Sequence, residues 1–323
     1  MRAVLTEEPA VAAPISRTDR LRRFMSVYWL RPENAFWMAL RSETLASVAW
    51  QGPGIDLGCG DGVFSFLHAG GVFDDDFDVF HDAAPLEAVR DEQVDIFDHL
   101  GARYHPAIVK RPGFTIDVGC DWKPNLLVKA GYLSLYEELV VHDNNRPLPF
   151  DAGGFRTVYC NTAYWVEDID GFLSELRRIT ADDGRVVLQV KLASMLRYTL
   201  ERHREVLGDR FLEIIGRGRA ETWPTVTDRA TWEARFTAAG LTIERAVPFI
   251  TRTHAHLWDV GLRPIAPMLI ELANNVTPAT RGRVKRRWVD LFCELCAPFC
   301  DPEVDLLAGQ DEPGEIMYVL RPG

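Results

Sequence analysis

Two stretches of the chain carry residues whose types and spacing could bind a ligand. The first, GIDLGCGDG at residues 54–62, ends a short apolar run with three glycines at every second position. Glycine lets the backbone turn tightly and admit a ligand at close range, so this segment could cradle a cofactor. The second, FTIDVGCD at residues 114–121, has the same order of Ile-Asp, aliphatic residue and Gly-Cys, but it ends in a carboxylate. A carboxylate at a strand end can accept hydrogen bonds from both hydroxyls of a ribose.

We interpret the two stretches as parts of one binding site. Asp121 would hold the ribose, and Trp122 beside it offers a flat apolar face for a purine. The spacing does not select for a dinucleotide, because Val63 stands where the third glycine of G-x-G-x-x-G would be. Asp82 is an alternative ribose ligand, since it lies 22 residues beyond Gly60, close to the usual interval of about 20. We favour Asp121 because the helix that follows it leads directly into the next apolar strand.

The surrounding segments predict alternating strands and helices. Strands are expected at residues 54–58, 114–121, 139–143, 155–161, 185–192, 241–249 and 314–322. Helices are expected at residues 17–49, 63–70, 125–139, 169–179 and 229–240, and over most of the sixty residues after 249. This alternation indicates an α/β fold with a Rossmann-like, mostly parallel and doubly wound sheet, extended by helical N-terminal and C-terminal additions.

The expected organisation is a single domain over residues 17–323 that follows a disordered tail over residues 1–16. An insertion at about 70–113 mixes apolar, acidic and proline positions, and we expect one short strand in it at residues 77–80. The helical segment at about 252–313 is expected to form a lid, and the segment WLRPENAFW at residues 29–37 is a second candidate for covering the site.

Between residues 54 and 190 the chain resembles the class I S-adenosylmethionine-dependent methyltransferases that have a D-x-G-x-G-x-G loop. DLGCGDG at 56–62 carries this resemblance, together with DWKPNLLVKA at 121–130 and LVVHDNNRPLPFDAGGFRTVYCN at 139–161. DGFLSELRRITADDGRVVLQV at 170–190 is similar to the helix and turn before the family's fifth strand. The resemblance implies a class I methyltransferase fold and a methyltransferase activity.

The resemblance also implies where the cofactor S-adenosyl-L-methionine would lie and that it would leave as S-adenosyl-L-homocysteine. The residues it implicates are Asp56, Gly58 and Gly60 at the methionine end, Asp121 at the ribose, Trp122 beside the adenine, Asp143 and Asn144 at the adenine edge, and Asn161 near the transferable methyl. Each of these residues could instead have a structural role. Asp56 and Asp143 could form turns, and Asn161 could be a capping residue. Trp122 could belong to the core.

Candidate catalytic residues follow from the demands of methyl transfer, an in-line displacement in which positioning and exclusion of water do most of the work. A hydroxyl acceptor also needs a general base. His254 and His256 in THAHLWD follow a predicted strand, and on an extended stretch both would face one side. Tyr164, with Trp165, could wall the acceptor site. The alternative for the histidines is a surface position without a catalytic role.

The charge and hydropathy of the chain limit the classes of partner that we expect it to bind. The 36 Lys and Arg and 47 Asp and Glu residues give a formal charge of −11, which disfavours nucleic acid. We find no window of about 18 uncharged apolar residues, so neither a membrane span nor a membrane partner is expected. The segment RGRVKRR at 281–287 is expected to be a solvated helix face or, alternatively, a patch for an anionic substrate or partner. We expect a small-molecule acceptor, such as a natural product or sugar intermediate, and a possible homodimer.

The cysteines favour core positions over a metal site. Cys293, Cys296 and Cys300 have the C-x2-C-x3-C pattern, but the spacing also puts them on one face of a helix and no second Cys or His pair lies nearby. We therefore expect no metal. Without a secretion signal, a reduced cytoplasmic location is the default. Two other functions stay open: an NAD(P)-dependent oxidoreductase, and a non-catalytic subunit that keeps the cofactor fold and binds a partner.

Overall fold

The computed structural model describes residues 15–91, 95–101, 104–216, 223–301 and 312–323. Of the tail that the sequence predicts to be disordered, residues 1–14 lie outside the described residues.

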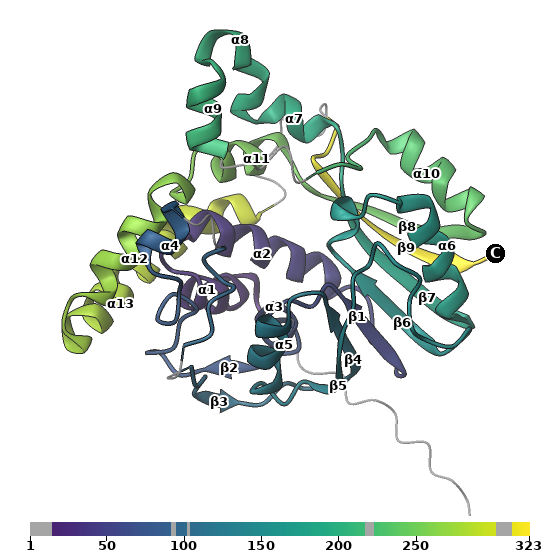
Figure 1. Ribbon diagram of the computed structural model, residues 1–323, viewed down its shortest axis with the longest axis horizontal. Coiled ribbons are helices and arrows are strands. Elements are labelled where there is room, and N and C mark those ends of the chain that lie inside the picture. Colours follow the sequence, from purple (N-terminus) through teal and green to yellow (C-terminus); the bar gives the residue numbers. More distant parts are fainter. Residues whose placement is uncertain (1–14, 92–94, 102–103, 217–222, 302–311) are drawn as a thin grey trace, which may run out of the picture.

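A seven-stranded sheet with the strand order β5-β4-β1-β6-β7-β9-β8 runs through the molecule (Figure 1). In this order its strands are Tyr136–Val141, Ile116–Asp121, Gly54–Leu57, Phe155–Cys160, Thr180–Lys191, Glu315–Pro322 and Leu241–Ile250. The pairings from β5 to β7 are parallel, and β9 is antiparallel to both β7 and β8. Because the chain builds outward from β1 to β5 and then returns to β6 on the other side, the order reverses beside β1. Open sheets of this kind bind ligands at such a switch point, at the carboxyl ends of the strands.

Helices cover both faces of the sheet, and neighbouring strand residues pack into two different cores. Val187 and Val319 belong to the core that contains α1 (Arg17–Val27), α2 (Pro32–Leu45) and α3 (Val63–His68). Val186 and Leu188 belong to the other core, with α6 (Ile169–Ile179) and α10 (Arg229–Ala238). The alternation follows the two-residue period of a strand. The predicted Rossmann-like, mostly parallel and doubly wound fold is confirmed.

One predicted boundary is wrong. The helix expected at 125–139 is only α5, Pro124–Gly131, and β5 already begins at Tyr136. The Tyr136 side chain packs against Gly62 and Gly119, and its hydroxyl donates a hydrogen bond to Asp56. These tertiary contacts draw Tyr136 into the sheet, and they override the helical spacing of the sequence.

The segment at 70–113 contains a two-stranded antiparallel sheet of β2 (Val72–Phe73) and β3 (Ile108–Lys110), and the short helix α4 (Leu86–Asp91). The strand predicted at 77–80 is wrong, because Asp78 turns inward to form a buried ion pair with Arg281 of α13 (Pro278–Cys296). Lys285, one helical turn further on, donates to the carbonyl oxygens of Asp75 and Phe77. Two of the cations expected on a solvated face thus hold this segment in place.

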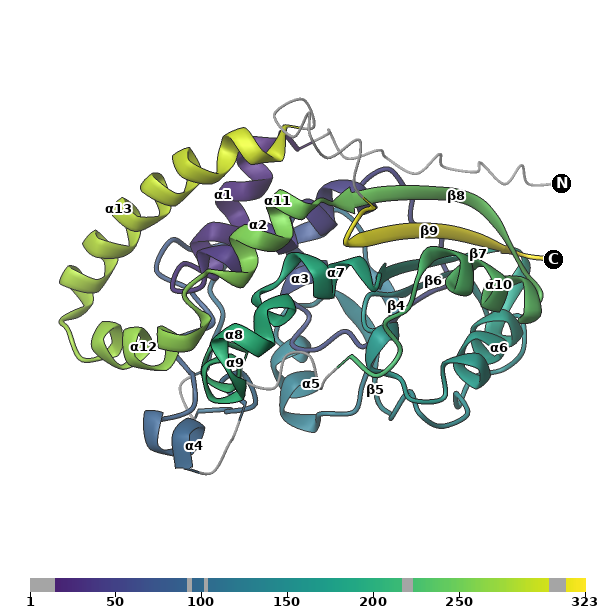
Figure 2. The ribbon, with the colours of Figure 1, turned by 90° about the horizontal axis from the view of Figure 1, so that it is seen from above.

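The segment after β8 forms α11 (Arg252–Asp259), α12 (Ala266–Asn274) and α13. Helix α11 begins beside the end of β8, whereas α12 and α13 lie at the end of the molecule away from β8 and β9 (Figure 2). Between β7 and α10 lie α7 (Ser194–Tyr198), α8 (Arg204–Leu207) and α9 (Asp209–Gly216). None of the helices in the described parts of the chain is long and apolar enough to cross a membrane.

Candidate functional site

The turn after β1 is built from glycines in the left-handed region. Gly58, Gly60 and Gly62 have φ angles of +78°, +57° and +73°. A Cβ at Gly58 would lie 2.2 Å from Oγ1 of Thr162, so close packing against the end of β6 requires glycine there. At Gly60 no described atom would lie within 4 Å of an added Cβ. The left-handed backbone therefore selects glycine at position 60, and the space beside it is open to a ligand.

Asp121 ends β4, and its carboxylate lies directly against this turn. The backbone N–H of Gly60 donates to Oδ2 of Asp121 at 3.0 Å, and the N–H of Lys123 donates to Oδ1 at 2.9 Å. Burial raises the pKa of Asp121, and these backbone hydrogen bonds oppose that rise. Asp82, the alternative ribose ligand, instead accepts a hydrogen bond from the N–H of Gly101 within the insertion. Only Asp121 of these two carboxylates therefore lies at a strand end beside the glycine turn.

Asp56 is buried beneath the turn and faces neighbouring elements. Its Oδ2 accepts hydrogen bonds from the hydroxyls of Ser65 on α3, at 2.5 Å, and Tyr136 on β5, at 2.7 Å. Burial raises the pKa of Asp56 to about 6, against the lowering effect of these two hydrogen bonds. In this arrangement Asp56 ties together the strand, the helix and the neighbouring strand that shape the turn.

The adenine-side candidates follow β4 and β5. The ring of Trp122 is 63% exposed, with Nζ of Lys123 at 5.4 Å from its centroid. The Asp143 carboxylate makes local hydrogen bonds, because its Oδ1 accepts from the backbone and side-chain N–H groups of Asn145. The side-chain oxygen of Asn144 is buried and has no hydrogen-bond partner among the described residues. An unpartnered buried acceptor is unusual in a folded protein, and this one lies next to Asp143 after the end of β5.

Residues of the insertion border this side of the site. Nζ of Lys123 pairs with Asp98 at 2.7 Å and with Asp95 at 3.4 Å, and Nζ of Lys129 donates to the carbonyl of Phe97 at 3.0 Å. The insertion therefore contacts the start of α5, two residues beyond Asp121.

Asn161 follows β6 and belongs to a hydrogen-bonded chain across the strand ends. Its Nδ2 donates to the hydroxyl of Tyr159 at 3.1 Å, and that hydroxyl donates to Oε1 of Gln189 at 3.0 Å. Gln189 in turn donates to the carbonyl of Arg41 on α2 at 3.0 Å. The helix that precedes the sheet in sequence is thus fixed over the ends of β6 and β7.

A buried charged cluster, which sequence reasoning missed, lies at the same edge. Arg41 of α2, Lys191 at the end of β7 and Glu315 at the start of β9 are 8%, 3% and 0% exposed. Nη2 of Arg41 pairs with Oε1 of Glu315 at 2.8 Å, and the Lys191 ammonium pairs with the same oxygen. Burial alone would raise the pKa of Glu315, but the charges of Arg41 and Lys191 outweigh it and lower the pKa. The carboxylate is therefore ionised at neutral pH.

Aromatic rings surround the ammonium of this cluster. Nζ of Lys191 lies between 4.7 and 5.8 Å from four ring centroids, those of Trp37, Tyr164, Trp223 and Trp258. Rings at such distances stabilise a cation through their π faces. The hydroxyl of Tyr164 lies 3.5 Å from Nη2 of Arg41, and burial raises the pKa of Tyr164. Tyr164 is thus part of this cluster, whereas Trp165 is 51% exposed.

The extended stretch expected to carry His254 and His256 is a helix, α11. Residues two apart on a helix point in different directions, so His254 is buried and His256 is exposed. Nδ1 of His254 accepts from the N–H of Thr251 at 3.2 Å in a capping box, and Nε2 lies 2.8 Å from the carbonyl of Phe299. His254 therefore holds the start of α11, and the two rings do not share a face.

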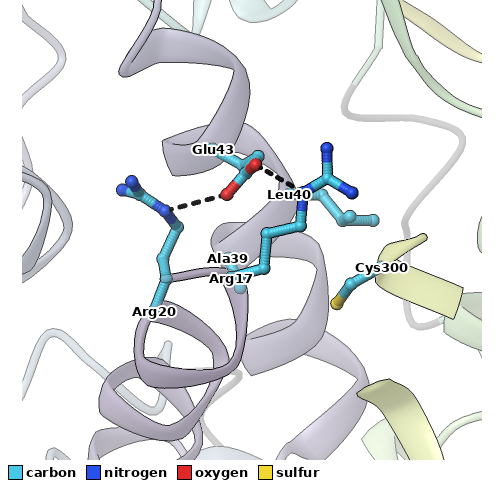
Figure 3. Close-up of a pocket in the computed structure, with 6 residues that line it drawn as sticks. All are labelled: Arg17, Arg20, Ala39, Leu40, Glu43 and Cys300. Atoms are coloured by element: carbon cyan, nitrogen blue, oxygen red, sulfur yellow. Dashed lines mark hydrogen bonds and ion pairs between the residues drawn. The ribbon is translucent and has the colours of Figure 1, made fainter. Parts of the chain in front are cut away.

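A separate small pocket lies between α1, α2 and the turn at Ala297–Cys300 (Figure 3). Arg17 and Arg20 both bind the carboxylate of Glu43 there, at 2.8 and 3.2 Å. The charged groups of this pocket pair with one another, and none of its lining residues lies at a strand end.

No family model and no curated protein matches the chain. Solved structures with a similar fold include a SAM-dependent methyltransferase from Thermotoga maritima, at 14% identity and a TM-score of 0.43, over 76% of this chain and 91% of that one. They also include a chain named as a methyltransferase in complex with the Haloferax volcanii Trm112 methyltransferase activator, at 15% identity and a TM-score of 0.45, over 96% of this chain and 99% of that one. A third is the [4+2]-cyclase SpnF, at 16% identity and a TM-score of 0.45, over 88% of this chain and 80% of that one. At these identities and scores the similarity does not indicate a substrate or the role of any residue.

Proposed function

We propose that the protein is an S-adenosylmethionine-dependent methyltransferase that acts on a small-molecule acceptor. The observation that carries this proposal is the contact between Gly60 and Asp121, which joins an open left-handed turn and a carboxylate at the switch point of the sheet. Such a pair can bind two parts of S-adenosylmethionine. The turn admits the methionine chain, and the carboxylate accepts hydrogen bonds from the ribose hydroxyls.

The residues present fit this cofactor. Each oxygen of Asp121 accepts one backbone hydrogen bond in the structure, and a carboxylate oxygen can accept two, so both can still receive ribose hydroxyls. The unpartnered side-chain oxygen of Asn144 is buried, and it could accept from the exocyclic amine of adenine once the side chain turns toward the ligand. Gly58 and Gly60 would line the methionine end, Trp122 would flank the adenine, and Asp143 would contribute at its edge. Asp56 would act mainly through the turn that it supports.

The acceptor would lie over the ends of β6, β7 and β9. When bound, the cofactor supplies a methyl group on a sulfonium, and the protein must orient the acceptor and exclude water. Asn161 and Tyr164 would contact that acceptor, with Lys191 and Glu315 behind them. An ionised Glu315 held between two cations is a weak base, so we assign it to orientation instead of proton removal. The net charge of −11 favours a small acceptor over nucleic acid.

Calorimetric titration tests the cofactor assignment. We expect S-adenosyl-L-homocysteine to bind with micromolar affinity and NAD not to bind. The opposite result would favour the oxidoreductase, and binding of neither ligand would leave the fold without the proposed function.

A substitution in the buried cluster tests the acceptor side separately. Lys191→Met should leave the affinity for S-adenosyl-L-homocysteine within about threefold of the wild type. In the presence of a pool of small acceptors, it should lower the rate at which S-adenosyl-L-homocysteine forms at least tenfold. Loss of cofactor affinity in this variant, at unchanged melting temperature, would instead place the cluster on the cofactor side.

A further inference from the structure

One flank of the outward face of α13 carries a row of exposed apolar side chains, which we call the α13 ridge. The buried side of this 19-residue helix carries Arg281, Lys285, Val289 and Cys293 at four-residue intervals. About 120° around the helix from this buried row, the exposed fractions of Val284, Leu291 and Leu295 are 43%, 52% and 53%. These three residues lie seven and four positions apart, so they share one face of the helix.

A second ridge lies on the neighbouring helix α12 and the turn before it. Its large apolar side chains are between 42% and 66% exposed: Ile265, Met268, Leu272 and Val276. Single exposed apolar residues are ordinary, but contiguous apolar patches mark interaction surfaces. The two helices form the edge of the molecule farthest from β8 (Figure 2), where the sheet would not obstruct a partner.

The charges beside the α13 ridge show which partner fits. Arg283 and Arg287 lie in the first half of the outward face, and Asp290 and Glu294 lie in the second half. A copy of the helix running in the opposite direction would bring Arg283 opposite Glu294 and Arg287 opposite Asp290. Both pairings have the same midpoint on the helix, between Trp288 and Val289. The same register brings Val284 opposite the Leu291–Leu295 part of the copy.

We propose that the outward face of α13 is a two-fold dimer interface that binds a second copy of this chain. In a two-fold interface the same surface of both copies must be self-complementary, and the antiparallel charge pattern meets this condition. A helix of this length is about 28 Å long. Because stable interfaces bury about 1,200–2,000 Å² in total, we expect the α12 ridge to contribute as well.

Net charge also favours this face. At −11 the copies repel each other over most of their surfaces. The exposed cations Arg283, Arg286 and Arg287 locally offset that repulsion. Asp290 pairs with Arg22 of its own chain at 2.7 Å, and because both side chains are exposed, this carboxylate can be shared with the partner's arginine.

Sedimentation velocity on the full chain over a concentration series tests the interface. We expect a dimer at micromolar concentration for the wild type and a mostly monomeric Leu291→Arg variant. Val206→Arg, at an 85% exposed apolar position on α8, is the matched control and should stay dimeric. A monomeric wild type at about 100 μM, or a dimer that Leu291→Arg does not weaken, would overturn the proposal.

Charge reversal tests the register independently of the apolar ridge. Arg283→Glu and Glu294→Arg should each raise the dimer dissociation constant about tenfold or more, because each creates two like-charge contacts across the two-fold axis. The double variant Arg283→Glu/Glu294→Arg should return to within about threefold of the wild type. A double variant that is as weak as the single ones would contradict the antiparallel arrangement.

Discussion

The backbone N–H of Gly60 donates a hydrogen bond of 3.0 Å to the carboxylate of Asp121, sixty-one residues further along the chain. This contact joins the glycine turn after β1 to the end of β4. It also brings the two similar stretches of the sequence into direct contact. In the proposed function, the turn holds the methionine end of an adenosyl cofactor and the carboxylate holds its ribose.

Gly60→Ala should weaken cofactor binding more than it weakens the fold. An alanine in the left-handed region costs about 1 kcal/mol, and the new methyl group would occupy the open space beside the turn. Gly240→Ala is a matched control, since Gly240 has a φ of +72° and also has no described atom within 4 Å of an added Cβ. Both variants should lose similar stability in urea denaturation, but only Gly60→Ala should lose affinity for S-adenosyl-L-homocysteine. Equal affinities in the two variants would show that the turn has only a structural role.

Asp56→Asn should remove a pH dependence of stability. The folded-state pKa of Asp56 is about 6 against an ordinary 3.8, so between these values the folded protein binds more protons than the unfolded one. Stability from this group therefore falls as pH rises from about 4 to about 6, by as much as about 3 kcal/mol. Asparagine can keep both hydrogen bonds through one oxygen. Urea denaturation at pH 4.5 and 7 should show a gain for Asp56→Asn relative to wild type only at the higher pH. A difference that is the same at both pH values would contradict the raised pKa of Asp56.

Arg281→Ala should destabilise the protein by about 3–5 kcal/mol, because it leaves the buried carboxylate of Asp78 without its partner. Arg286→Ala removes an exposed cation from the same helix and should change the free energy of unfolding by less than about 0.5 kcal/mol. Guanidinium denaturation of both variants measures the difference. Equal effects would mean that α13 does not anchor the insertion.

Substitution of the two candidate catalytic histidines should affect the stability of the protein to different extents. His254→Ala should cost about 1–2 kcal/mol, since it removes the hydrogen bond that Nδ1 of His254 accepts from the N–H of Thr251 and leaves the carbonyl of Phe299 without its contact. His256→Ala, at an exposed position, should cost less than about 0.5 kcal/mol. Thermal denaturation decides between them, and a larger loss for His256→Ala would contradict the capping role.

The sequence alone was sufficient to predict the sheet and the strand ends that matter most. A helix and a strand follow Asp121 without a spare element, so the sequence predicts that the strand ending at Asp121 neighbours the first strand, and β4 is the neighbour of β1. The spacing around Tyr136 predicts a helix, and only the contacts of Tyr136 with Asp56 and Gly62 explain why it belongs to β5.

The buried charged cluster could not have been predicted in the same way. Arg41, Lys191 and Glu315 come from distant parts of the sequence and meet because β9 pairs antiparallel with β7, which brings its first residue beside the last residue of β7. The start of α11 is hard to predict for a local reason. Thr251 and His254 have the spacing of a capping box, but histidine is not the usual partner in that motif.

The affinity of Asp121→Asn for S-adenosyl-L-homocysteine, beside that of Asp82→Ala, tests the cofactor site most directly. Loss of charged hydrogen bonds to the ribose should raise the dissociation constant of Asp121→Asn at least about 30-fold, whereas Asp82→Ala should stay within about threefold of the wild type. Unchanged affinity in Asp121→Asn, or a larger loss in Asp82→Ala, would contradict the proposed site.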